Sequence, residues 1–187
     1  MEEVVRIIYF KLENFLSIYN ATGMNEFSFD REKSQNRLIL ILGANGSGKS
    51  SILDELSPLP LEHTNFRNKS RILKDKIGNK IIIYKLDNGV YYKCEIIYDI
   101  KKTVCYLSTS IDRETWENLN PNGNVSTYVE LLETHLGFSK NYIKVGYLSS
   151  AISNFIVMKP TERNEYISEW LPNIDVYLKA HKIVTTK

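Results

Sequence analysis

The most constraining feature of this 187-residue sequence is the stretch GANGSGKSS at residues 43–51, between an aliphatic run, LILIL, and the segment ILDEL. It satisfies the spacing G-x-x-x-x-G-K-[ST] at every fixed position. The segment over 37–43, with its aliphatic run LILIL at 38–42, predicts a central strand buried on both faces. After Lys49 the apolar residues recur at helical spacing, so the glycines are expected where a strand turns into a helix.

This spacing is typical of a phosphate-binding loop. Glycines admit backbone conformations closed to other residues and let main-chain N–H groups approach phosphate oxygens. The helix that begins near Lys49 directs its positive end at the same anion. Lys49, the predicted catalytic residue, is expected to reach the β- and γ-phosphates of ATP, and the Ser50 hydroxyl to coordinate Mg²⁺. The other predicted nucleotide contacts are Asn45, Gly46, Ser47, Gly48 and Ser51.

Composition adds only broad limits. The chain has 24 basic and 22 acidic residues and a formal charge of +2, so any site for a polyanion must be local. No signal peptide or long apolar stretch indicates secretion or a membrane. Cys94 and Cys105 lie in strand-like segments, and we expect both to be reduced and buried in a cytoplasmic protein. A cross-strand disulfide between them is the alternative.

Alternating apolar and polar residues predict an antiparallel meander over residues 80–111. Its strands are expected at 80–86, 90–98 and 103–111, with turn residues between them. A T-x-x-E capping box at Thr127 and Glu130 predicts a helix over about 128–137. A further helix is predicted over 161–171, directly after a proline.

Three stretches together resemble the SMC-like DNA-repair ATPases. These are FKLENFLSIYN at 10–20, which resembles a first strand ending in N-F-x-S, the loop and helix GANGSGKSSILDEL, and SNFIVMKPTERNEYISEWLPNIDVY at 153–177. In the last stretch the residues that match the family's spacing are Phe155, Pro160, Glu162, Arg163 and Leu171. The resemblance is greatest to the SbcC-type exonuclease ATPase and to the recombination endonuclease subunit of large bacteriophages.

The resemblance implies an α/β P-loop NTPase fold of the ATP-binding-cassette, SMC-like type. It comprises a mixed sheet around the 37–43 strand and the antiparallel meander beside it. The whole chain, 1–187, is then a single N-terminal ATPase lobe. Within it the resemblance places the Q-loop region at 145–153 and the start of a coiled coil at about 174–187.

The sequence departs from the family pattern at several points. Ser149 stands where the Q-loop glutamine that reaches toward Mg²⁺ is expected, and Leu16 replaces a basic residue that contacts nucleotide. The sequence contains neither a Walker B aspartate–glutamate pair nor an L-S-G-G signature. In the family these elements lie in a C-terminal lobe beyond the coiled coil. We therefore expect this chain to bind ATP without hydrolysing it alone.

The function that the resemblance implies is DNA double-strand-break processing and recombination. The expected partners are the C-terminal lobe of the same ATPase, a second ATPase head that dimerises on ATP, an SbcD-type metal-dependent nuclease and double-stranded DNA. The expected location is the cytoplasm of a bacterial cell or a phage-infected host. The alternative is a non-hydrolytic ATP-binding module that pairs with another ATPase head or with DNA. A small-molecule P-loop kinase is disfavoured because a meander stands where its lid helix would be.

Overall fold

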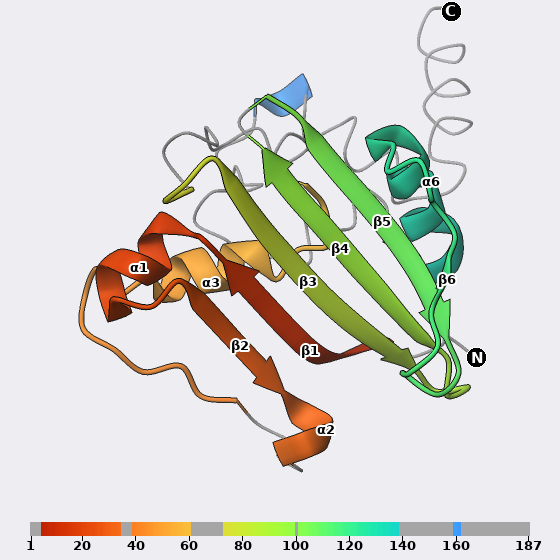
Figure 1. Ribbon diagram of the computed structural model, residues 1–187, viewed down its shortest axis with the longest axis horizontal. Coiled ribbons are helices and arrows are strands. Elements are labelled where there is room, and N and C mark those ends of the chain that lie inside the picture. Colours follow the sequence, from red (N-terminus) through yellow and green to blue (C-terminus); the bar gives the residue numbers. More distant parts are fainter. Residues whose placement is uncertain (1–4, 35–38, 61–72, 100, 139–158, 162–187) are drawn as a thin grey trace, which may run out of the picture.

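The computed structural model describes residues 5–34, 39–60, 73–99, 101–138 and 159–161 (Figure 1). In this part of the chain six strands form one sheet in the order β2-β1-β3-β4-β5-β6. The strands are β1 (Val5–Glu13), β2 (Glu26–Asp30), β3 (Ile77–Leu86), β4 (Tyr91–Asp99), β5 (Thr103–Ser110) and β6 (Glu117–Asn118). The chain thus places β3 next to β1, and the meander β3-β4-β5 extends the sheet from there.

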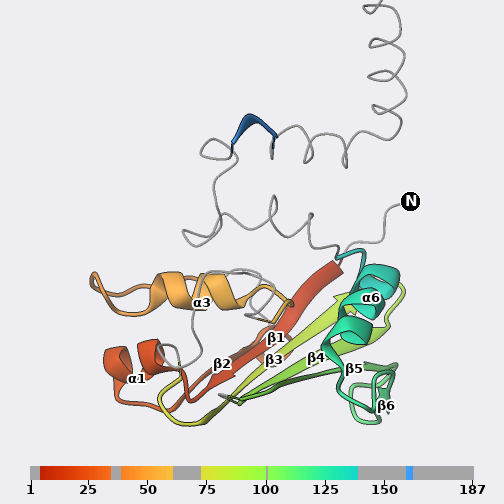
Figure 2. The same cartoon turned by 90° about the horizontal axis from the view of Figure 1, so that it is seen from above.

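The helices lie around this sheet. They are α1 (Leu16–Thr22), α2 (Arg31–Ser34), α3 (Lys49–Glu55) and α6 (Val125–Leu136). Figure 2 shows α3 and α6 over the same face of the sheet, α3 near β1 and α6 near β5. The core lies between these two helices and the strands beneath them.

The core follows from the alternation of residues along each strand, because successive side chains point to opposite faces of a sheet. On β3 and β4 every second residue is buried toward the helices. The buried apolar residues of the strands are joined by Ile52 of α3 and by Tyr128, Val129, Leu132 and Leu136 of α6. Helix α3 is therefore packed on the sheet through the apolar side chain of Ile52.

The meander has its three strands where the alternation predicts them. The β3–β4 turn closes at Gly89, whose φ of 86° is a left-handed conformation that glycine adopts without strain. Its amide donates to the Leu86 carbonyl at 3.0 Å. The β4–β5 turn closes through two backbone hydrogen bonds between Asp99 and Lys102.

The predicted strand at 37–43 is wrong for the residues that the structure describes. From Ile39 onward this segment has no strand conformation, and Leu40 and Leu42 are 72% and 80% exposed. A strand needs a neighbour to bond its amides and carbonyls. None of the six described strands pairs with this segment.

Two further expectations about strands need correction. The sheet is not mixed: every pairing between its described strands is antiparallel. The stretch 10–20 is not one strand either, because β1 ends at Glu13 and α1 begins at Leu16. Asn14 ends the strand with a φ of 61°, a left-handed conformation that asparagine tolerates better than most residues.

The capping box predicted at Thr127 and Glu130 is wrong as well. The helix begins at Val125, and its cap is Asn124, whose side chain accepts from the Ser126 amide at 2.9 Å. An extended asparagine before the first turn is as good a cap as threonine, so the earlier residue forms the cap. The other end agrees with the prediction, since Gly137 closes the helix with a φ of 68°.

Candidate functional site

The loop from residue 43 to 48 leads directly into α3. Gly46 and Gly48 have φ angles of 81° and 79°, both in the left-handed region. Gly48 is the N-cap of α3, and its carbonyl accepts the first helical hydrogen bond, from the Ile52 amide at 3.0 Å. The predicted turn from loop to helix is thus present, and two of its positions have conformations that glycine adopts without strain.

Two of the glycines also lie close to neighbouring atoms. A Cβ on Gly43 would overlap the Ser47 hydroxyl, and a Cβ on Gly48 would lie 3.1 Å from the Ser17 carbonyl oxygen of α1. The loop is therefore folded tightly on itself at one end and packed against α1 at the other.

Lys49 lies across the opening of this loop. Its Nζ donates to the carbonyl oxygens of Gly43 and Ala44, both at 2.7 Å, and lies 3.4 Å from Ser47 Oγ. The ammonium group is thus fixed over the start of the loop while the side chain stays partly exposed. This places one positive charge beside the exposed turn, where an anion would be bound.

The remaining predicted contacts lie in the same turn and helix start. Asn45, Gly46 and Ser50 are exposed, whereas Ser47 and Ser51 are partly buried. The structure thus brings the predicted residues 45–51 together in one loop and first helical turn. Their contacts with a nucleotide stay predictions.

The residues fit ATP with Mg²⁺. The compact glycine loop, the ammonium of Lys49 and the exposed hydroxyl of Ser50 are the donors that a triphosphate and its metal need. Within the described ranges, no three His, Cys, Asp or Glu side chains gather as a metal site. The fit therefore rests on Mg²⁺ taking most of its ligands from phosphate and water, as it usually does.

Other predicted site elements lie outside the described residues. These are Ser149 with its Q-loop region at 145–153, the family-like segment beyond Thr161, and the coiled-coil start at about 174–187. Leu16, which replaces the expected basic residue, is described: it is the first residue of α1 and is partly buried. None of the described helices combines the length and apolar character that a membrane-spanning helix requires.

Two features near the loop or its helix α3 were not predicted from the sequence. One is α1, whose Ser17 and Ala21 face Gly48. The other is the buried pair of Lys80 on β3 and Glu55 at the end of α3, with Nζ and Oε2 3.2 Å apart. A signal for the second existed, because Lys80 falls at a core-facing position of the alternation in β3, where a lysine requires an acidic partner.

Comparison with known proteins gives one finding on the family. A family model described as an AAA domain matches residues 10–183, which includes the loop, α6 and the described sheet except the first five residues of β1. Such domains are found in SMC-like ATPases. No curated protein matches the chain.

Proposed function

Because this chain belongs to the AAA domain family, we propose that it is the ATP-binding lobe of an SMC-like ATPase. We further propose that this ATPase works with a metal-dependent nuclease on DNA double-strand breaks. The coarser assignment, a nucleotide-binding ATPase module, follows from the family. The observation that carries the proposal is the Lys49 ammonium, held 2.7 Å from the Gly43 and Ala44 carbonyl oxygens at the mouth of a glycine loop.

On this lobe the chain's own residues bind and orient the triphosphate. The amides of the loop and the first turn of α3 donate to phosphate oxygens, and Lys49 exchanges its bonds to the loop carbonyls for bonds to phosphate. The Ser50 hydroxyl would hold Mg²⁺, which would neutralise charge on the β- and γ-phosphates. These groups stabilise charge but include no general base.

The missing groups are proposed to come from a complementary lobe of the same ATPase. The support is the exposed aliphatic segment of Ile39, Leu40 and Leu42, which leads into the nucleotide loop. Leu53, on the adjoining α3, is 54% exposed as well. Exposing these apolar side chains to water costs free energy. A second lobe whose strands paired with this segment would cover them. The same lobe would bring the Walker B pair and the signature helix to the nucleotide.

The wider assembly is proposed from the family resemblance. Two complete heads would close around two ATP molecules and open after hydrolysis, and this cycle would regulate an SbcD-type nuclease on double-stranded DNA. The described residues contribute a phosphate cradle to this cycle.

Calorimetry with Mg-ATP tests the proposal at its first step. The intact chain is expected to bind, and Lys49→Ala is expected to weaken binding by at least about tenfold, because a charge-assisted contact to phosphate is lost. Lys33→Ala on α2 is the matched control, an exposed lysine outside the loop, and should bind like the parent. No binding by the parent would overturn the proposal.

Turnover assays test the division between lobes. ATP hydrolysis should appear only when a lobe bearing Walker B and signature elements is added. Steady turnover by this chain alone would contradict that division. Binding without turnover in the presence of the complementary lobe would instead favour a non-hydrolytic module.

A further inference from the structure

Lys80 is buried on the core face of β3, under the end of the phosphate-loop helix. Its side chain is 1% exposed and that of Glu55 is 2% exposed. The ammonium donates to Glu55 Oε2 at 3.2 Å, to the Ser57 carbonyl at 2.9 Å and to the Leu59 carbonyl at 3.1 Å. Each of the three ammonium protons therefore has an acceptor.

All three acceptors belong to the end of α3 and the segment that follows it. Glu55 is the last residue of α3 and Lys49 is the first. At a rise of about 1.5 Å per residue, the two lie roughly 9 Å apart along one short helix. A displacement of the Glu55 end therefore moves the Lys49 end, and with it the nucleotide loop.

Lys80 itself is held rigidly. In the sheet it pairs with Leu12 of β1 on one side and Ile96 of β4 on the other, and both of these are fully buried. The segment after α3 has a second attachment, because the Tyr128 hydroxyl of α6 donates to the Pro58 carbonyl at 2.8 Å. The far end of α3 is thus fixed both to the central strands and to α6.

A buried ion pair is an expensive way to stabilise a fold, since apolar residues of similar volume usually perform as well or better. The advantage of an ion pair is that its hydrogen bonds are directional and fix one arrangement, whereas apolar contacts such as that of Ile52 allow α3 to slide on the sheet. A lysine at the end of a helix also complements the negative end of its dipole. The pair is therefore better suited to setting the orientation of α3 than to adding stability.

We propose that Lys80 and Glu55 are positioning residues for the nucleotide, which lock the phosphate-loop helix to the sheet so that the loop amides and Lys49 point at the phosphates. This inference rests on the proposed function and adds to it a role for two residues that do not touch the ligand.

The test removes both charges together. In the double variant Lys80→Met/Glu55→Gln neither partner is left as a lone buried charge, so the fold should be preserved. The melting temperature should fall by a modest amount, because the Ser57 and Leu59 carbonyls lose their shared donor. Mg-ATP affinity is expected to fall on the order of tenfold, because the loop loses its fixed orientation. A merely structural pair would leave affinity unchanged in a variant that stays folded at the assay temperature, and that result would overturn the proposal.

Lys85→Met is the matched control. Lys85 lies on the same strand and also pairs with a glutamate, Glu32, at 2.7 Å, but this pair is exposed and does not contact α3. Its loss should leave Mg-ATP affinity unchanged. If the double variant fails to fold, Glu55→Asp keeps both charges and draws the carboxylate back by one methylene. It should weaken Mg-ATP binding severalfold while the melting temperature stays close to that of the parent, and unchanged affinity there would overturn the proposal.

Hydrogen–deuterium exchange without nucleotide separates this inference from the proposed function. The backbone amides of α3 should exchange faster in the double variant, or in Glu55→Asp if that is the variant that folds, whereas those of β3 and β4 should not change. Equal exchange in α3 would overturn the positioning role whether or not the parent binds ATP. If the parent binds no ATP but α3 exchanges faster, the proposed function fails and the anchoring of α3 stands.

Discussion

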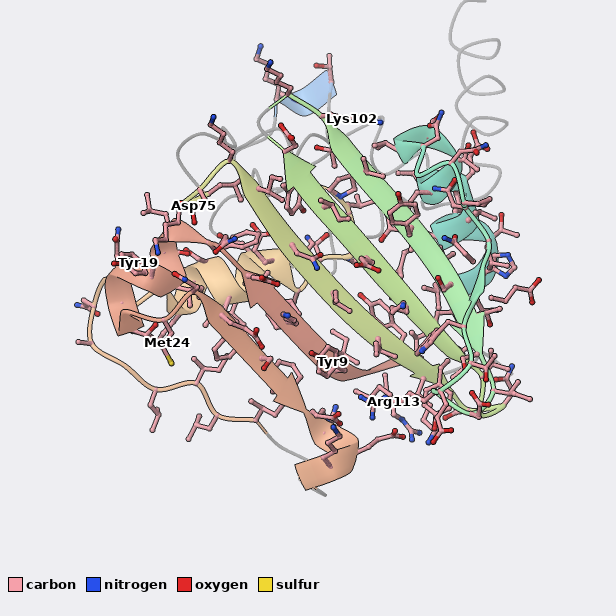
Figure 3. The ribbon with its side chains drawn as sticks, in the orientation of Figure 1. Tyr9, Tyr19, Met24, Asp75, Lys102 and Arg113 are labelled. Carbon is pink, nitrogen blue, oxygen red and sulfur yellow. The ribbon has the colours of Figure 1, made fainter. Side chains whose placement is uncertain are left out.

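The Arg113 guanidinium donates to the Asp30 carboxylate through two nitrogens, although the two residues are 83 positions apart in sequence. Nη2 lies 2.7 Å from Oδ2 and Nη1 lies 3.3 Å from Oδ1. The contact joins the loop after β5 to the end of β2. In the sheet, β2 is one edge strand and β5 lies next to the opposite edge strand, β6. The guanidinium also lies 5.8 Å from the Tyr9 ring centroid (Figure 3). Arg113 therefore joins the edge strand β2 to the meander across the sheet face opposite α3 and α6.

Replacing Arg113 by glutamine should lower the free energy of unfolding by about 1 kcal/mol near neutral pH, because a bidentate, partly buried contact is lost. Burial raises the pKa of Asp30, but hydrogen bonds from Arg113 and the Lys33 amide outweigh it, so the pKa lies below its usual 3.8. A carboxyl with a lowered folded-state pKa stabilises the fold above its unfolded pKa and loses that contribution as pH falls.

Urea denaturation across a pH series checks this prediction. The difference between parent and Arg113→Gln should be constant from neutral pH down to the usual pKa of aspartate. It should shrink as pH falls further, through the lowered pKa of Asp30. A difference that stays constant into the acid range would mean that the contribution of Arg113 depends on the charge neither of Asp30 nor of Glu32, the second carboxylate that it contacts, at 3.2 Å.

Alanine at Gly48 should be more damaging than alanine at Gly46. Both positions have left-handed φ angles, so each alanine costs about 1 kcal/mol in strain. Among the described residues, the new Cβ meets a neighbour only at Gly48, the Ser17 carbonyl at 3.1 Å, and none of them lies within 4 Å at Gly46. Urea denaturation of the two variants measures the difference. Equal losses would show that α1 does not constrain the loop.

The two cysteines should be inert in the native protein. Both are free and fully buried, so the alternative of a disulfide between them does not hold in this structure. Burial raises the pKa of the Cys94 thiol to about 12, against smaller opposing effects of Tyr128 and Lys80. At about pH 8 only a small fraction of Cys94 is therefore in the reactive thiolate form, and its burial keeps reagents away from the sulfur.

A thiol-specific disulfide reagent checks this with a colour change. Neither cysteine should react on the timescale on which Ser28→Cys, placed at an exposed position of β2, reacts completely. Labelling of the native pair should instead follow the rate of unfolding in urea. Rapid labelling without denaturant would contradict the buried positions.

The parts of the fold that sequence predicts well are those set by near neighbours. The nucleotide loop follows from glycines at positions such as Gly48, whose conformation few other residues tolerate. The meander follows because alternation and turn residues such as Gly89 act within a few residues. The Lys49 contacts to Gly43 and Ala44 are equally local, within six positions along the chain.

The parts that sequence did not predict depend on distant contacts. Pairing of the 39–42 segment needs a neighbouring strand, and no local signal shows whether the chain supplies one. α1 was missed because its residues suit a strand as well as a helix, and the choice is made at Asn14. There a φ of 61° and bonds to Asn25 and Lys74 turn the chain. Lys80 and Glu55 are 25 positions apart, and composition does not show which acidic residue pairs with this lysine.

The exposed aliphatic segment gives the last prediction. Serine at both Leu40 and Leu42 should leave the free energy of unfolding within about 0.5 kcal/mol of the parent, because these side chains are 72% and 80% exposed and lose little by substitution. Association with the complementary lobe should be lost, since the polar side chains cannot be buried in a shared sheet without cost.

Ile111→Ser is the control for this pair, because Ile111 is 83% exposed but lies after β5, away from the nucleotide loop. It should change neither stability nor association. Urea denaturation and sedimentation of the mixed lobes provide the two measurements. A large loss of stability in the double leucine variant would mean that the segment packs within this lobe. Unchanged association would mean that the complementary lobe binds elsewhere, because burial of these leucines is the physical reason for assembly at this edge.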